Sequence, residues 1–199
     1  MNNARLLDER TRPDFRDLYG VHAAECTALD AAVGRIRLGG MSLAAPELDG
    51  VKQIRVLLGE MNALTLSSEA DSLASDRRRQ ARIVLISSLF ARGRLAVRIA
   101  PLAGWSPDFS IFRTDSELNT GRGSCRAPVL MIGPHWFERP YPHPGPALGV
   151  LVTGAPAVRA LERFDELWAQ AHDVKGPIEE ILEAALRRAG GRSLAASAG

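Results

Sequence analysis

The residues best suited to chemistry gather in the loop 134–146, which carries His135, Glu138 and His143 among several prolines. A histidine and a glutamate this close in sequence can form an acid–base pair that moves a proton during a reaction. The alternative is a structural loop, because its prolines fix the backbone and its aromatic residues can pack over a sheet edge. Cys125 could join the two histidines around a metal ion, but the spacing matches no zinc pattern, so we expect no metal and no cofactor.

Arginines form a second set of candidates, for binding phosphate groups. Arg78, Arg79 and Arg82 lie in one expected helix, and Arg122 and Arg126 lie in the loop TGRGSCR. The planar guanidinium group matches phosphate oxygens, and a glycine-rich loop leaves backbone N–H groups free to contact an anion. For the helical arginines the alternative is a solvated face that pairs with neighbouring acidic residues.

The elements that must position these residues alternate between helices and strands. Apolar residues at helical spacing predict a first helix from Pro13 to about Gly34, followed by a first strand at Arg35–Leu38. A long helix is predicted from Ser67 to about Ala91, and an amphipathic helix from Ala155 to about His172. Further strands are predicted over 53–58, 95–100, 109–112, 129–132 and 148–152. This alternation predicts an α/β fold, with a mixed sheet and helices on both of its faces.

We expect one domain over 1–173, an appended helix over 174–190 and a frayed, disordered tail over 191–199. The appended helix has an apolar face, which either packs back on the domain or contacts a partner. The candidate partner interface consists of Ile178, Ile181, Leu182 and Leu186.

Composition narrows the function classes only moderately. The 199 residues carry a net charge of +2 and give a pI of about 8.8, which permits a nucleic-acid partner without requiring one. The two cysteines occupy unlike contexts, which indicates free thiols in a reducing compartment. No apolar run is long enough to cross a bilayer, and the charged N-terminus has no signal-peptide pattern. We therefore expect a cytoplasmic protein with no membrane association.

The order strand, loop, strand, loop, strand, helix from about Trp105 onward resembles the C-terminal part of a phospholipase D-like (HKD) domain. The family motif His-x-Lys-x4-Asp falls on Asp108, Ser110 and Asp115, and the family turn Gly-Ser-x-Asn begins at Gly133. Asp115 and Gly133 match, whereas the catalytic His and Lys positions hold Asp108 and Ser110. The resemblance covers roughly 14–173 and indicates a degenerate copy with a single motif.

The resemblance implies a phosphodiester chemistry that this chain is poorly equipped to perform. In the family a His attacks the phosphodiester, a second His protonates the leaving oxygen, and the Lys residues hold phosphate charge. One motif per chain implies a homodimer with its site on the two-fold axis. A carboxylate at Asp108 repels phosphate, and Ser110 cannot supply the charge of a lysine.

The expected function is therefore that of a non-catalytic subunit, either a scaffold or a partner that binds DNA or RNA. The resemblance and the composition suggest a bacterial multiprotein system, including DNA modification or phage defence. The alternative is a phosphodiesterase or nuclease that acts as a dimer or with a partner chain. Its catalytic candidates are His135, Glu138, Asp115, Ser110 and Asp108. A soluble α/β domain of unrelated fold is the third possibility.

Overall fold

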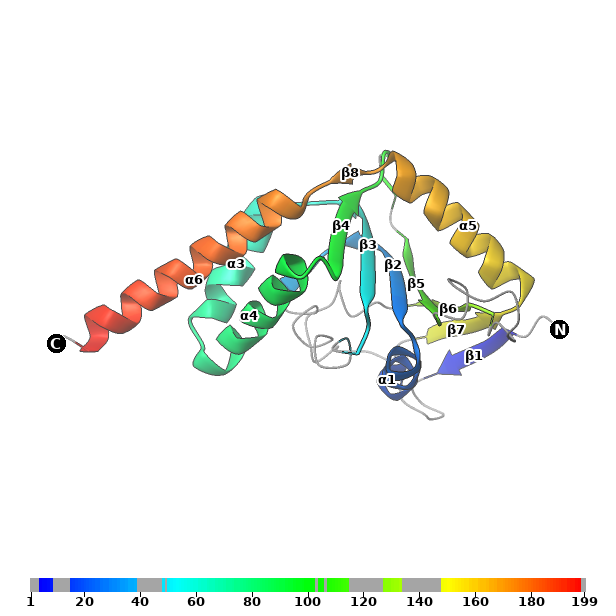
Figure 1. The fold of residues 1–199 in the computed structure, drawn as a ribbon, viewed down its shortest axis with the longest axis horizontal. Coiled ribbons are helices and arrows are strands. Elements are labelled where there is room, and N and C mark those ends of the chain that lie inside the picture. Colours follow the sequence, from blue (N-terminus) through cyan, green and yellow to red (C-terminus); the bar gives the residue numbers. More distant parts are fainter. Residues whose placement is uncertain are drawn as a thin grey trace.

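The computed structural model describes residues 4–8, 15–38, 48, 50–102, 104–105, 107–114, 127–133 and 148–197 (Figure 1). One eight-stranded sheet forms the centre of this part of the chain, with the strand order β1-β7-β6-β5-β2-β3-β4-β8. The strands are β1 (Ala4–Asp8), β2 (Ala28–Arg35), β3 (Gln53–Glu60), β4 (Leu95–Ile99), β5 (Asp108–Arg113), β6 (Val129–Ile132), β7 (Leu148–Thr153) and β8 (His172–Asp173). The helices are α1 (Phe15–Glu25), α3 (Ala63–Ala74), α4 (Arg77–Ala91), α5 (Ala155–Gln170) and α6 (Lys175–Ser197).

The sheet is mixed. Strands β2, β3 and β4 run parallel to one another, and the pairs on either side of them are antiparallel. The predicted mixed α/β fold is confirmed. The predicted strands from 53 onward and the helix that begins at Ala155 are also present, with bounds that differ by at most two residues.

Helices cover both faces of the sheet, as predicted. Ala31 and Val33 of β2 belong to the apolar core that includes residues of α1, α3, α4 and α6. Ala32, between them in sequence, belongs to the core under α5, with Phe164 and Leu167. Successive residues of a strand point to opposite faces, so the two cores lie on opposite sides of the sheet. Figure 1 shows α5 apart from the other helices.

The prediction for residues 13–38 is wrong. The first helix ends at Glu25 rather than near Gly34, and the next strand is Ala28–Arg35 rather than Arg35–Leu38. Residues 28–34 are all buried, because this strand lies inside the sheet with helices above and below it. A strand buried on both faces shows no polar alternation, so its Ala and Leu residues extend the helical spacing of α1.

The long helix predicted from Ser67 to Ala91 is two helices. The side-chain oxygen of Asn62 accepts a hydrogen bond from the Thr65 backbone N–H at 3.0 Å and caps α3, which begins at Ala63, four residues before the predicted start. Ser75 ends α3, and α4 begins at Arg77. Both helices turn an apolar side to the same core, so their combined pattern reads as one helix in the sequence.

The appended helix packs back on the domain. Ile178 and Leu182 are 1% and 0% exposed in the core that also contains Leu66 of α3. Ile181 and Leu186 are partly buried against the same core, so this face is covered within the chain. Helix α6 continues to Ser197, whereas the composition predicts a frayed tail that begins at residue 191.

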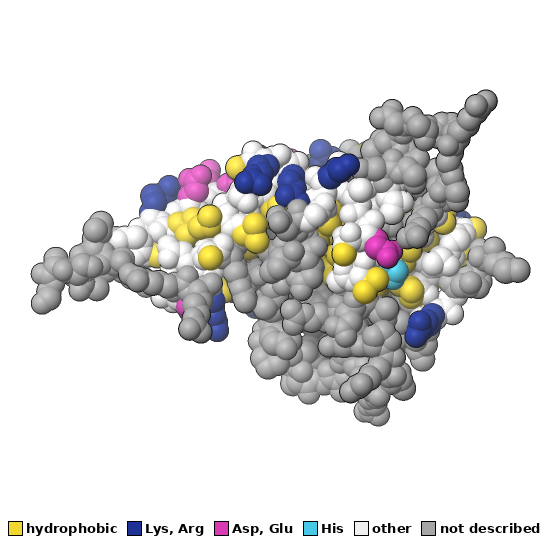
Figure 2. Space-filling model, turned by 60° about the horizontal axis from the view of Figure 1, so that its bottom comes forward, with side chains coloured by type: hydrophobic (Ala, Val, Ile, Leu, Met, Phe, Trp, Pro, Cys, Tyr) yellow, Lys and Arg dark blue, Asp and Glu magenta, His cyan; other side chains and the backbone are white. Residues whose placement is uncertain are grey.

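The described surface carries its large exposed apolar side chains in several separate places. Figure 2 shows hydrophobic side chains in small groups and Lys and Arg side chains spaced in a row along one margin of the face in view. None of the helices in the described ranges is both long and apolar enough to cross a membrane. The exposed large apolar residues are Val21, Leu64, Val84, Leu102, Ile132 and Val158.

Candidate functional site

Strand β5 carries Asp108 at its start and Ser110 two residues further into the sheet. Asp108 begins β5 opposite Val33, near the carboxyl end of β2. Its carbonyl oxygen accepts a hydrogen bond of 2.9 Å from the Gly133 backbone N–H, which follows β6. Two positions that the family motifs pick out, Asp108 and Gly133, are therefore neighbours in space although 25 residues separate them.

Ser110 lies inside the sheet layer. It is 1% exposed and pairs with Ala31 of β2 on one side and Met131 of β6 on the other. A serine hydroxyl at this depth cannot reach a phosphate group in solvent. The side chain that the resemblance aligns with the family's lysine is thus short, neutral and buried in this protein.

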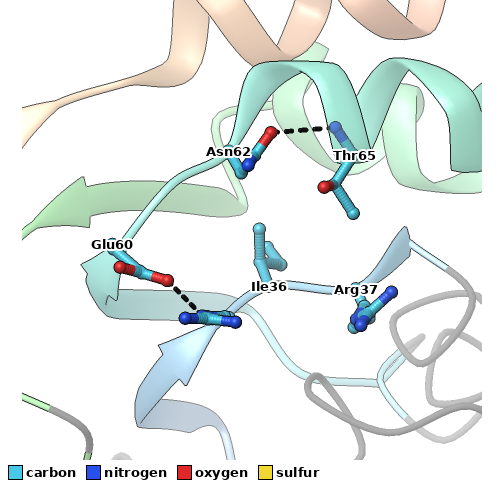
Figure 3. Close-up of a pocket in the computed structure, with 6 residues that line it drawn as sticks. Ile36, Arg37, Glu60, Asn62 and Thr65 are labelled. Atoms are coloured by element: carbon cyan, nitrogen blue, oxygen red, sulfur yellow. Dashed lines mark hydrogen bonds and ion pairs between the residues drawn. The ribbon is translucent and has the colours of Figure 1, made fainter.

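A hollow of about 120 Å³ opens at the carboxyl ends of the parallel strands β2 and β3. Open α/β sheets generally bind their ligands at this edge. Figure 3 shows the side chains that surround the hollow, which come from the end of β2, the end of β3 and the start of α3. They are Arg35, Ile36, Arg37, Glu60, Asn62 and Thr65.

Each arginine of the hollow has an acidic partner. Arg35 forms an ion pair with Glu60, its neighbour across the β2–β3 ladder, and their side chains are 70% and 57% exposed (Figure 3). Arg37 donates to the Glu69 carboxylate at 2.6 Å, and the Leu38 backbone N–H donates to the other oxygen of Glu69 at 2.8 Å. Exposed ion pairs contribute only about 0–1 kcal/mol, so a phosphate group can compete for the Arg35 guanidinium.

Gly59 fixes the segment that leads from β4 to β5 at this edge. A Cβ atom on Gly59 would lie 1.8 Å from the carbonyl oxygen of Trp105 and 3.1 Å from that of Gly34. The chain can therefore cross the end of β3 only because residue 59 has no side chain. This contact helps to set where β5, and with it Asp108, begins.

A cluster of charged side chains lies on the α5 side of the sheet. Asp30 is 0% exposed, and its two carboxylate oxygens contact Arg55 at 2.6 Å and Arg113 at 2.7 Å. Arg55 also contacts Asp165 of α5 at 2.7 Å and lies 5.0 Å from the centre of the Phe164 ring. Burial lowers the pKa of Arg55, but the hydrogen bonds and charges of Asp30 and Asp165 outweigh that effect and raise it above its ordinary value. The cluster links β2, β3 and β5 to α5.

The structure describes the side chain of only one of the remaining predicted site residues. Arg79 of α4 has a 57% exposed side chain, 3.3 Å from Asp76 in the preceding turn, as a solvated helix face would have. Arg78 and Arg82 lie in the same helix, but their side chains fall outside the described residues. His135, Glu138, Asp115, Arg122 and Arg126 also lie outside the described residues. In the described ranges, no group of three or more His, Cys, Asp or Glu side chains is placed to hold a metal ion.

The sequence prediction missed the hollow at the carboxyl edge and the cluster around Asp30. Arg35 and Glu60 meet only because β2 and β3 pair in parallel, and β2 was predicted as helix. A usable signal was present in the charged residues at the ends of mainly apolar runs, with Arg35 directly after 28–34 and Glu60 two residues after 56–58. A second signal was Asp30, a lone acidic residue inside an apolar run.

No family model matches the sequence, and no curated protein matches it. NucT from Helicobacter pylori superposes with a TM-score of 0.52 at 8% identity, over 87% of this chain and 100% of NucT. Nuc from Salmonella typhimurium, a phospholipase D family member, gives 0.47 at 12% identity, over 87% and 99% of the two chains. Phosphatidylserine synthase from Haemophilus influenzae Rd KW20 gives 0.48 at 8% identity, over 97% of this chain and 46% of that one. The superposition on NucT shows that the two proteins share a fold, in agreement with the phospholipase D-like fold that the resemblance predicted.

Proposed function

We propose that this protein is a non-catalytic phospholipase D-like subunit that binds nucleic acid. The observation that carries the proposal is the content of β5, where Asp108 and the buried Ser110 stand at the family's His and Lys positions. Hydrolysis of a phosphodiester needs a nucleophile and positive charge around the phosphate. The buried hydroxyl of Ser110 cannot supply that positive charge, and the carboxylate of Asp108 repels the phosphate that it would have to attack.

The hollow at the carboxyl edge is the surface we assign to phosphate binding. Arg35 and Arg37 project there from the end of β2, just beyond Val33, which pairs with Asp108 of β5. The exposed Arg35–Glu60 pair holds its guanidinium weakly, so the group can turn to a phosphate oxygen. Figure 2 shows Lys and Arg side chains in a row along one margin of the view. Such a row fits a partner with regularly repeated negative charges, as a nucleic-acid backbone has.

The test is fluorescence anisotropy with labelled single- and double-stranded DNA and RNA at two salt concentrations, together with cleavage gels of the same oligonucleotides. We expect binding that weakens as salt rises, because bound phosphates release counterions, and no cleavage. Cleavage that the variant His135→Ala abolishes would support the alternative, a phosphodiesterase or nuclease.

A pair of matched variants locates the binding surface. Arg35→Ala combined with Arg37→Ala should weaken binding about tenfold or more. The slope of log Kd against log salt concentration should fall by the amount that corresponds to about two phosphate contacts. Arg187→Ala is the control, because Arg187 is equally exposed at 70% and also pairs with a glutamate, Glu183, but lies on α6. Equal losses in the two variants would exclude the hollow as the site.

The proposal includes assembly as a homodimer or within a larger bacterial complex, of the kind that modifies DNA or defends against phage. Light scattering during size-exclusion chromatography measures the mass of the particle with and without DNA. A mass of twice 21.5 kDa would support the dimer. A monomeric mass in both conditions would contradict the homodimer, and a complex with a different protein chain would then be the remaining proposal.

A further inference from the structure

A second hollow, of about 340 Å³, lies at the opposite end of the sheet from the first. It lies beside the amino end of β2, because Cys26 is two residues before that strand and Thr114 follows Arg113, the partner of Ala28. The end of α1, the end of β5, the start of β6 and the end of β7 surround it. The lining residues are His22, Glu25, Cys26, Phe112, Thr114, Ala127, Val129 and Thr153.

The inner wall of this hollow is apolar and chemically inert. Phe112 and Cys26 are 4% and 5% exposed, and the Cys26 thiol donates to the Ala23 carbonyl oxygen at 3.4 Å. Burial raises the pKa of Cys26 to about 12, so the thiol stays protonated near neutral pH. A protonated thiol is neither a nucleophile nor a metal ligand, which excludes covalent capture and thiolate-bound metal through Cys26.

The polar groups of the hollow can recognise one hydrogen-bonding group. The ring of His22 packs against Phe112 with 5.5 Å between ring centres, and burial lowers the pKa of His22, although Glu25 opposes the shift. A neutral imidazole offers one donor and one acceptor nitrogen. The Glu25 carboxylate at the edge of the hollow disfavours an anion. Figure 2 shows a histidine side chain beside acidic and hydrophobic side chains.

We infer that this hollow binds a small, uncharged and mainly apolar molecule that carries one hydrogen-bonding group, such as a phenol. Its volume lies within the range of about 300–1,000 Å³ that is typical of small-molecule sites. Its apolar walls and few convergent polar groups are the usual composition of such sites. The inference is independent of nucleic-acid binding, because the two hollows lie at opposite ends of the sheet.

The probe we would use is 2-naphthol, with 2-naphthoate as its anionic counterpart on the same ring system. Calorimetric titration should show 2-naphthol binding that saturates below about 1 mM, and 2-naphthoate binding at least about tenfold more weakly. Methyl resonances of Val129 and Thr153 should shift on titration, whereas those of the exposed Val158 on α5 should not. Absence of saturation, or equal binding of the two probes, would overturn the inference.

Replacing either of two exposed alanines with leucine provides a matched test. Ala127 is exposed at the edge of the hollow, and Ala63 is exposed at the start of α3, beside the other hollow. Ala127→Leu should weaken 2-naphthol binding about tenfold by occupying the entrance, and Ala63→Leu should leave it unchanged. If Ala63→Leu weakens binding as much, or Ala127→Leu has no effect, the probe binds elsewhere and the inference fails.

Discussion

Asp30 is a carboxylate without solvent exposure, and its ionic partners come from two other strands. Removing a charge from water costs several kcal/mol, which the 2.6 Å and 2.7 Å contacts with Arg55 and Arg113 offset. Once such a cluster exists, each member depends on the others. The charge at residue 30 therefore constrains how β2, β3 and β5 sit relative to α5.

Asp30→Asn should lower the free energy of unfolding by about 3–5 kcal/mol, because it leaves two guanidinium groups with little exposure and no carboxylate between them. Urea denaturation measures the change. Asp165→Asn is the control, since its side chain is 53% exposed and the loss should be only about 0–1 kcal/mol. Similar losses in both variants would contradict the assigned role of Asp30.

His22 should make stability depend on pH. Burial lowers its pKa from 6.5, so the unfolded chain binds a proton more readily than the folded protein. The free energy of unfolding should therefore fall as pH drops below about 6.5, and His22 should contribute no change at higher pH. His22→Gln should lose less stability than the wild type between about pH 7 and pH 5 in urea titrations. Equal losses in the variant and the wild type over this range would contradict the role assigned to His22.

At the scale of the elements, the sequence predicts best where each strand is separated from its neighbours by turn residues. Strands β5, β6 and β7 meet that condition, so the strand that carries Asp108 and Ser110 could be predicted. Strand β2 follows α1 after two residues and is buried on both faces, so nothing local separates it from the helix. The hollow at its carboxyl end depends on a pairing between segments 25 residues apart, which no local pattern encodes.

Gly59→Ala should destabilise the protein by about 1–3 kcal/mol, because the new methyl group meets the backbone of Trp105 rather than a movable side chain. Thermal unfolding measures the loss. Gly50→Ala is the matched control, since a Cβ there meets nothing within 4 Å. If both variants unfold at the same temperature, the close crossing at the end of β3 is not a constraint on the fold.

Leu182→Ala should lower the free energy of unfolding by about 2–5 kcal/mol, because Leu182 is fully buried between α6 and the rest of the core. Leu64→Ala provides the comparison, since Leu64 is 84% exposed on α3 and its removal should cost almost nothing. Chemical denaturation distinguishes the two. A stable Leu182→Ala variant with altered assembly would instead point to the predicted partner interface.

At the scale of the whole molecule, β1 forms one edge of the sheet and pairs with β7. Residues Ala4–Asp8 cover the edge of β7, whose sequence LGVLVT is apolar and favours strands. Deleting residues 1–8 should expose that edge and increase aggregation, which static light scattering follows over time. Adding Val150→Lys to the truncated chain should reduce the aggregation, because a charge protects a sheet edge. Unchanged scattering after the deletion would show that β1 does not protect β7.

The pairing of β1 with β7 also determines an order of events during synthesis. Asp8 and its partner Leu148 are 140 positions apart, so β1 leaves the ribosome first and its partner among the last strands. At about 5–20 residues per second, the interval between them is roughly 7–28 s. Strands β2, β3 and β4 can pair in parallel during that time, whereas β1 has no edge to join. The nascent chain therefore completes its sheet from the middle outward, and its first strand is among the last to dock.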